Sequence, residues 1–422
     1  MKPIIYILLS TAALFLQSCT EPYALQTNTY ESALVIEATL TDEFKFQEIK
    51  LSRTYKLEED GPDIEIGAQV FVTDSNGNQY NFSEGNGKYI SQQEFQALPN
   101  VTYQLHISTS DGKSYISTNE TLTSLTNIDA ITATRGNNSQ GENGVQIVAN
   151  TTKSTNGIEY YRFDYKETNK IIAPQWVDNR GVVVYFNPPP SNYVDPPGQL
   201  YAEPWPYEAK ICYATENSKE ISISNTSLNT SNSNISLVRF LAATDYKIAN
   251  RYSIKVTMYN ESLAAYNFYD ALKKASTNGS LLSQNQPGFY SGNIKNSNNT
   301  SEKVIGFFDV SHVSNKRIFF NFEDIFPNQQ KPEYPYYCPE INFTNDAEFR
   351  YLLCFCVPNL TPIPPGPCPR DPGCSGNYIL ASVDNRVKAV YLFGADEVYL
   401  VNIQCGDCTS FSSNVRPSFW ED

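Results

Sequence analysis

The sequence predicts a mainly β protein, in which an N-terminal immunoglobulin-like β-sandwich precedes a larger, irregular β-rich domain with one main α-helix. Tyrosine and phenylalanine are abundant, 29 and 23 among 422 residues, and aromatic side chains favour strands. Apolar and polar residues also alternate with the period of a strand over residues 33–120. The expected divisions are a signal peptide at 1–18, a tether at 19–32, the sandwich at 33–122 and the β-rich domain at 123–422.

The first 18 residues have the features of a lipoprotein signal peptide. Lys2 gives a positive start, and Ile4 to Leu16 form an apolar stretch that is too short to span a bilayer comfortably. The stretch ends in Leu16-Gln17-Ser18-Cys19, which resembles a bacterial lipobox, although Gln17 stands where a small residue is usual. We therefore expect Cys19 to carry a diacylglyceryl anchor. The alternative is an ordinary secretory signal with Cys19 as a structural thiol.

The residues that follow Cys19 predict a short tether. Residues 20–32 are polar and show little apolar periodicity. Fully extended, they span at most about 45 Å. The folded body is therefore expected to lie close to the membrane or to a partner in the membrane.

The predicted sandwich at residues 33–122 has the clearest strand pattern. Leu34, Ile36 and Ala38 share one face of its first strand. Asn76-Gly77 and Asp111-Gly112 are dipeptides typical of β-hairpin turns. About six or seven short strands separated by such turns are typical of an immunoglobulin-like sandwich.

The larger β-rich domain carries one predicted helix, at Glu261–Ser276. Asn260 can cap it, Glu261 suits its positive N-terminal end, and the side chains of Ala265, Phe268 and Leu272 share a face that can pack on a sheet. The strand candidates of this domain are Val145–Ala149, Tyr160–Tyr165, Tyr252–Met258, Val304–Val310, Arg317–Phe322, Tyr378–Ser382, Ala389–Phe393 and Val398–Ile403.

The cysteines favour disulfide bonds in an exported chain. Without Cys19, eight cysteines remain, and an even number is typical of a disulfide framework. The candidates are Cys212, Cys338, Cys354, Cys356, Cys368, Cys374, Cys405 and Cys408. Their pairing cannot be derived from the sequence. The alternatives are a zinc or iron–sulfur site, formed by Cys405-x-x-Cys408 with Cys354-x-Cys356, and redox chemistry.

Charge and composition exclude several functions. The formal net charge of −14 argues against binding to nucleic acid, which needs clustered lysine and arginine. His106 and His312 are the only histidines, and both are expected at the surface, which leaves little for acid–base chemistry or metal binding. No nucleophile elbow, phosphate-binding loop or zinc-protease motif occurs. We expect neither an enzyme nor a cofactor or metal site.

A proline-rich segment from Trp176 to Tyr207 is the candidate binding surface. Rigid proline backbone can present aromatic rings to a small ligand, a peptide or a partner. The candidates are Trp176, Tyr185, Phe186, Tyr193, Tyr201, Trp205 and Tyr207. An equally acceptable alternative is a long loop that these rings pack onto the second domain.

Several motifs resemble a known family. They are Cys19-Thr20-Glu21-Pro22-Tyr23, Leu34-Val35-Ile36-Glu37, Ile49-Lys50-Leu51-Ser52-Arg53, Asp74-Ser75-Asn76-Gly77-Asn78, Tyr103-Gln104-Leu105-His106-Ile107, Asp111-Gly112-Lys113-Ser114-Tyr115, Ser311-His312-Val313-Ser314-Asn315-Lys316-Arg317, and the ending Cys405-Gly406-Asp407-Cys408 with Pro417-Ser418-Phe419-Trp420. Together they resemble the Bacteroidota lipoproteins of the domain-of-unknown-function 4249 family. Members often have Gly-Gly where this chain has Ser412-Ser413.

The resemblance implies an outer-membrane lipoprotein whose gene often lies beside that of a TonB-dependent receptor, and it implies no enzymology. The leading expectation is a lipid-anchored binding or lid protein that works with such a β-barrel receptor in nutrient uptake. The cell surface is the expected location in preference to the periplasmic face. The alternative function is that of a structural or adhesive surface lipoprotein.

Overall fold

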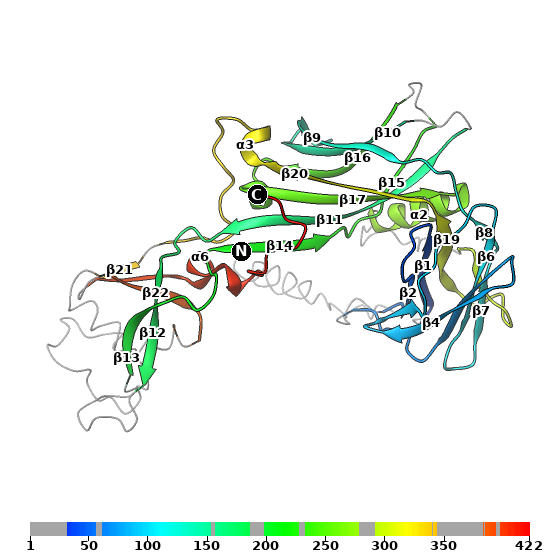
Figure 1. The fold of residues 1–422 in the computed structure, drawn as a ribbon, viewed down its shortest axis with the longest axis horizontal. Helices are drawn as coiled ribbons and strands as arrows, with labels where there is room; N and C mark the ends of the chain where they lie inside the picture. Colours follow the sequence, from blue (N-terminus) through cyan, green and yellow to red (C-terminus); the bar gives the residue numbers. More distant parts are fainter. Residues whose placement is uncertain are drawn as a thin grey trace, which may run out of the picture.

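The computed structural model describes residues 32–55, 61–152, 157–185, 198–227, 233–277, 292–339, 341–343, 383, 385–393 and 397–422, and it is mainly β, as predicted. Figure 1 shows an N-terminal lobe at one end, a central sandwich, and a C-terminal module at the opposite end. No helix of the described ranges is long and apolar enough to cross a bilayer. The predicted signal peptide and Cys19 lie outside these ranges.

The N-terminal lobe is one continuous sheet around a single apolar core, so the strands predicted to form a two-sheet immunoglobulin-like sandwich at residues 33–122 form one sheet instead. Its strands pair in the order β18-β7-β6-β3-β4-β5-β2-β1-β19, and β8 pairs with β6. Alternate residues, such as Ile36, Val72 and Leu105, point into the core, as their spacing predicts. The strands are β1 (Leu34–Thr41), β2 (Glu48–Arg53), β3 (Gln69–Asp74), β4 (Gln79–Gly85), β5 (Lys88–Ser91), β6 (Thr102–Ser108), β7 (Ser114–Ser117), β8 (Glu120–Thr121), β18 (Ile294–Asn296) and β19 (Val304–Ser311).

The hairpin between β3 and β4 forms at the dipeptide expected from the sequence. Gly77 has a φ of +85°, a conformation that glycine adopts without a steric penalty. The Asp74 carboxylate accepts hydrogen bonds from the backbone N–H groups of Asn76 and Asn78, each at 2.9 Å. The turn is therefore stabilised by its own side chain as well as by its glycine.

Two strands from later in the chain complete the lobe. β19 runs parallel to β1, with Leu34 opposite Val304 and Thr41 opposite Ser311. β18 pairs with β7. The sheet thus includes residues 294–296 and 304–311, which lie beyond the boundary predicted at residue 122.

The two ends of this sheet meet at Asn293, directly before β18. Its Nδ2 donates to the carbonyl oxygen of Phe308 in β19, and its Oδ1 accepts from the N–H of Phe308, both at 2.8 Å. The backbones of Gly292 and Gly306 are in close contact here, so that a Cβ on Gly292 would stand 1.6 Å from the carbonyl oxygen of Gly306. A side-chain amide therefore replaces backbone pairing where the sheet closes.

The central sandwich contains two sheets with the apolar core between them. One sheet has the order β16-β10-β9, and the other has the order β14-β11-β17-β20, with β15 also paired to β11. This division of strands between two sheets is typical of immunoglobulin-like sandwiches. The strands are β9 (Ile128–Asn137), β10 (Asn143–Thr152), β11 (Tyr160–Ile172), β14 (Ile211–Asn217), β15 (Ser222–Asn225), β16 (Ser233–Ala242), β17 (Arg251–Glu261) and β20 (Val313–Asn321).

The main helix, α2 (Leu263–Thr277), follows β17 and confirms the predicted helix with a later start. The side chains of Ala265 and Phe268 are buried against Phe307 of β19, on the face that the sequence indicates. Glu261, predicted to begin the helix, is instead the last residue of β17. Asn260, predicted as the cap, donates from its side chain to the carbonyl oxygen of Thr126.

The C-terminal module joins a hairpin to a small three-stranded sheet. The hairpin consists of β12 and β13, and the sheet has the order β21-β23-β22. The strands of the module are β12 (Asn179–Tyr185), β13 (Gly198–Pro204), β21 (Ile341–Phe343), β22 (Lys388–Phe393) and β23 (Glu397–Asn402). Two short helices, α6 (Ile403–Gly406) and η2 (Cys408–Ser410), follow β23, and two others, η1 (Tyr246–Ile248) and α3 (Phe322–Ile325), border the central sandwich.

Candidate functional site

Four cysteines of the described residues form two disulfides at the C-terminal module. Cys212 pairs with Cys408, and Cys338 pairs with Cys405. The two cysteines of Cys405-x-x-Cys408 therefore have separate distant partners, so these thiols form neither the metal site nor the redox pair considered from the sequence. The other candidates, Cys354, Cys356, Cys368 and Cys374, lie outside the described residues.

The two tryptophans predicted as binding residues are partly buried, Trp176 against the end of the central sandwich and Trp205 against the C-terminal module. Trp176 lies against the apolar cluster around Cys212 and Cys408, and the Lys210 ammonium stands 4.9 Å from the centre of its ring. Trp205 donates from Nε1 to the carbonyl oxygen of Val177 at 2.8 Å. Both rings therefore pack the segment onto the rest of the protein, as in the alternative of a packed loop.

The remaining aromatic candidates divide between packed, exposed and undescribed positions. Tyr207 donates to the buried Asp407 carboxylate at 3.0 Å, which fixes its ring. Tyr201, on β13, is exposed. Phe186 and Tyr193 lie outside the described residues, as does the side chain of Tyr185. Of the predicted set, Tyr201 is the described ring that faces solvent.

His312, expected at the surface, is largely buried where β19 leads into β20. Its Nδ1 lies 2.5 Å from Asp42 Oδ2, and its Nε2 lies 3.2 Å from Asn127 Oδ1. Burial raises the pKa of Asp42, but hydrogen bonds from His312 and from the N–H of Val313 outweigh it and keep that pKa below its usual value. His312 therefore connects Asp42, directly after β1 of the lobe, to Asn127, directly before β9 of the central sandwich.

His106, the other histidine, is partly buried on β6. Its ring stacks on Phe71 with centroids 4.6 Å apart, and Nε2 lies 3.1 Å from the Thr73 hydroxyl. Burial lowers the pKa of His106, because it disfavours the charged form. Within the described ranges, His, Cys, Asp and Glu side chains form no group of three or more that could hold a metal ion.

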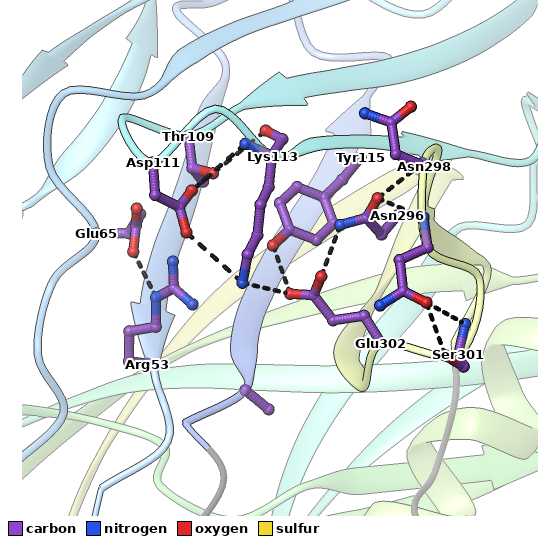
Figure 2. A network of polar contacts seen from close by, with 12 residues as sticks. Arg53, Glu65, Thr109, Asp111, Lys113, Tyr115, Asn296, Asn298, Ser301 and Glu302 are labelled. Atoms are coloured by element: carbon purple, nitrogen blue, oxygen red, sulfur yellow. Dashed lines mark hydrogen bonds and ion pairs between the residues drawn. The ribbon is translucent and has the colours of Figure 1, made fainter.

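A polar network covers the end of the lobe where β1 begins (Figure 2). Glu302 is at its centre and accepts from Lys113 Nζ at 3.1 Å, from the Tyr115 hydroxyl at 2.9 Å and from Asn296 Nδ2 at 2.7 Å. Burial raises the pKa of Glu302, but these partners outweigh it and lower that pKa overall. The network therefore ties the β6–β7 turn to the β18–β19 turn.

Arg53 and Glu65 form an ion pair beside this network, as Figure 2 shows. Arg53 Nε donates to Glu65 Oε2 at 2.6 Å, and both side chains are mostly buried. The Glu65 carbonyl oxygen accepts from the Tyr89 hydroxyl at 2.8 Å. The segment around Glu65 is thus fixed to the lobe by both its side chain and its backbone.

A buried charged group, which we call the junction cluster, lies where the lobe, the central sandwich and α2 meet. It consists of Arg162 (β11), Tyr259 and Glu261 (β17), Tyr269 (α2) and Asp309 (β19). The Arg162 guanidinium lies over two rings, 4.1 Å from the centre of Tyr259 and 4.7 Å from that of Tyr269. Burial and the Asp309 charge raise the pKa of Glu261 to about 8.

Two groups of exposed apolar side chains lie at opposite ends of β1. The loop patch consists of Phe44, Phe46 and Leu98, beyond the end of β1. The tether-end patch consists of Tyr55, Ile64 and Ile66, beside its beginning. Large exposed apolar side chains that gather in one place are typical of contact surfaces.

The sequence does not predict the junction cluster or the two patches. Nothing in the local sequence separates Arg162 or Asp309 from an ordinary surface charge in a strand. The two phenylalanines of Glu43-Phe44-Lys45-Phe46, in a charged loop, are the one local signal that could have indicated the loop patch.

The fold and the disulfides define a mainly β, disulfide-bonded protein with two β-rich units before its C-terminal module. The sequence profile of Domain of unknown function (DUF4249) matches residues 20–317, so the chain belongs to this family. The match includes the whole lobe and most of the central sandwich and ends within β20. None of the curated proteins compared with the chain matches it.

Proposed function

We propose that this protein is a non-enzymatic accessory subunit, anchored in the outer membrane by a lipid on Cys19, that binds or covers a TonB-dependent β-barrel receptor in nutrient uptake. The first support is the short stretch of chain between the anchored cysteine and the first strand of the fold. Cys19 ends the apolar stretch, and only residues 20–33 separate it from the first residue of β1. A lipid there would keep the lobe close to the surface in which a receptor lies. We place the protein on the outer face of that membrane.

The loop patch supports a receptor-binding role. Phe44 is 65% exposed and Phe46 50%, yet their loop is ordered, because Lys45 and Phe95 pair through their backbones. Ordered aromatic side chains can be buried by a partner at a small cost in entropy. This patch is therefore our candidate for the receptor contact, and the exposed Tyr201 is our candidate for a small ligand or peptide.

The test is purification of the tagged full chain in mild detergent from its native host. We expect a β-barrel receptor to co-purify with the wild type and to be lost from the variant Phe44→Ser/Phe46→Ser. The matched control is Ile235→Ser/Leu237→Ser, which removes two equally exposed apolar residues from β16 of the central sandwich and should retain the receptor. Recovery of the wild type without any barrel protein would contradict the proposal.

The structural or adhesive alternative has one supporting observation. The central sandwich has the two-sheet strand division of immunoglobulin-like domains, which many cell-surface proteins share. Deleting the gene distinguishes the two functions. An adhesive protein would be needed for surface attachment and not for uptake, whereas a receptor subunit would be needed for uptake.

A further inference from the structure

Ile64, Glu65 and Ile66 reverse the usual alternation at the surface of the lobe. The segment runs beside β2, since the Glu65 N–H donates to the Leu51 carbonyl oxygen at 3.0 Å. Glu65 points inward to Arg53, whereas the side chains of Ile64 and Ile66 point outward and are 49% and 63% exposed. A fold that buries the carboxylate and exposes both isoleucines opposes the usual distribution of these residue types.

This patch lies beside the point where the tether joins the fold. Ala33 accepts a backbone hydrogen bond from Thr54 at 3.0 Å, next to the exposed Tyr55. On the other side of β2, the backbone N–H of Arg53 donates to the Asp63 carbonyl oxygen at 2.8 Å. Ile64 is therefore about two strand spacings, roughly 10 Å, from the start of β1.

We propose that the tether-end patch, made of Tyr55, Ile64 and Ile66, inserts into the interfacial region of the lipid bilayer. This inference rests on the lipid anchor of the proposed function, because three side chains are too few to hold a protein on a membrane by themselves. The anchor would keep the patch at a high local concentration beside the bilayer. Isoleucine suits the edge of the hydrocarbon region, and tyrosine suits the layer of the headgroups.

The polar network gives this end of the lobe the rigidity that the proposal needs. The Arg53–Glu65 ion pair fixes the segment between the two isoleucines, and Figure 2 shows it beside the Lys113–Glu302 pair. The apolar side chains are thus ordered before they meet a membrane, so that little conformational entropy is lost on insertion.

The proposal also orients the lobe. The eight residues of β1 extend for about 25 Å from the tether end towards the loop patch. With the tether end on the lipid, the length of β1 holds Phe44 and Phe46 away from the bilayer.

The test uses the full lipidated chain in phosphatidylcholine vesicles, with and without bromine on the acyl chains, because brominated lipid quenches tryptophan only by contact. Ile64→Trp and Ile66→Trp place a tryptophan in the patch, and Leu237→Trp places one at a comparably exposed site on β16. The wild-type signal of Trp176, Trp205 and Trp420 is subtracted. We expect brominated lipid to remove the added fluorescence of both patch variants and to leave that of Leu237→Trp unchanged.

Flotation with the vesicles separates the two proposals. If the wild type does not float, or if Cys19→Ala floats equally well, the lipid anchor is wrong and the proposed function fails with it. If the proteins float through Cys19 but neither patch variant is quenched, or Leu237→Trp is quenched to the same extent, the membrane contact is wrong and the anchor stands.

Discussion

Arg162 on β11 donates from Nε to the Glu261 carboxylate at the end of β17 over 2.8 Å, and the Glu261 side chain is completely buried. The Asp309 carboxylate lies 3.9 Å from the same guanidinium. One buried cation thus faces two buried carboxylates, and burial raises the pKa of both. Because β19 belongs to the lobe and β11 to the central sandwich, these charges influence how firmly the two units are joined.

Replacing Glu261 with glutamine should stabilise the protein at alkaline pH. The folded pKa of about 8 lies above the ordinary 4.5. The contribution of protonated Glu261 to the free energy of unfolding is therefore fully present below pH 4.5 and is lost as the pH rises to 8. Over this window the wild type should lose up to about 1.4 kcal/mol per pH unit relative to Glu261→Gln. Urea unfolding at several pH values measures the difference.

The control for this prediction is Arg162→Met, which leaves two buried carboxylates without their cation. We expect it to lower the free energy of unfolding by about 3–5 kcal/mol at neutral pH. A Glu261→Gln variant that unfolds as easily as Arg162→Met would show that ionised Glu261 stabilises the junction, against our expectation.

Glu167 is buried like Glu261, and its replacement by glutamine should have the opposite effect. Burial raises the pKa of Glu167, but hydrogen bonds from Lys247, Tyr252 and Arg239 outweigh it and lower that pKa overall. Its stabilising effect is therefore present above pH 4.5 and is lost as the pH falls through the lowered value. Glu167→Gln should cost about 2–4 kcal/mol at pH 7. The cost should shrink in acid, and a cost that is independent of pH would contradict the assignment.

Replacing Asn293 with aspartate should weaken the contact with β19 at the point where the two ends of the lobe's sheet meet. The amide nitrogen of Asn293 donates to the Phe308 carbonyl oxygen and to Glu120 Oε1, both at 2.8 Å. A carboxylate there would face two acceptors and retain only the bond from the Phe308 N–H. We expect a loss of about 2–4 kcal/mol for the aspartate and about 1–3 kcal/mol for Asn293→Ala. Hydrogen exchange of the β19 amides should increase in both variants, and unchanged protection would contradict this role.

The strand pattern of the lobe was predictable because its causes are local. Alternation in residues 33–120 marks the strands, and turn glycines such as Gly77 mark the hairpins. The partner of β1 was not predictable. Val304–Val310 is a clear strand candidate, but its parallel pairing with Leu34–Thr41 depends on the intervening central sandwich, which returns the chain to the lobe. Glu261 suits a helix start by its charge, and only the distant Arg162 explains why it ends a strand.

The candidate binding residues were harder to predict than the strands, for a reason that lies in their chemistry. A tryptophan has the same sequence signal whether its ring faces a ligand or its own domain. Trp205 is packed because Val177 offers a carbonyl oxygen at 2.8 Å, and no local pattern indicates that. The outward direction of Ile64 and Ile66 is likewise not indicated by the local sequence. It follows from the ion pair that holds the Glu65 side chain inward, against Arg53 on the neighbouring strand.

The two disulfides should differ in how much they stabilise the C-terminal module. Cys212 and Cys408 are separated by 196 residues, and Cys338 and Cys405 by 67. Since a cross-link restricts the unfolded chain more when its loop is longer, we expect Cys212→Ala/Cys408→Ala to cost more than Cys338→Ala/Cys405→Ala. Each should cost about 2–5 kcal/mol, and because the shorter loop lies within the longer one, the difference should be only roughly 0.5–1 kcal/mol.

Urea unfolding without reductant measures both losses, and the fluorescence of Trp176 and Trp205 reports on the module directly. Burial acts in the same direction as loop length, because Cys212 and Cys408 are completely buried beside Ile171 and Ala173. Replacing them with alanine also removes packed sulfur atoms, at a further cost in the folded state. If the Cys338→Ala/Cys405→Ala variant proves the less stable of the two, neither loop length nor burial controls the stability of this module.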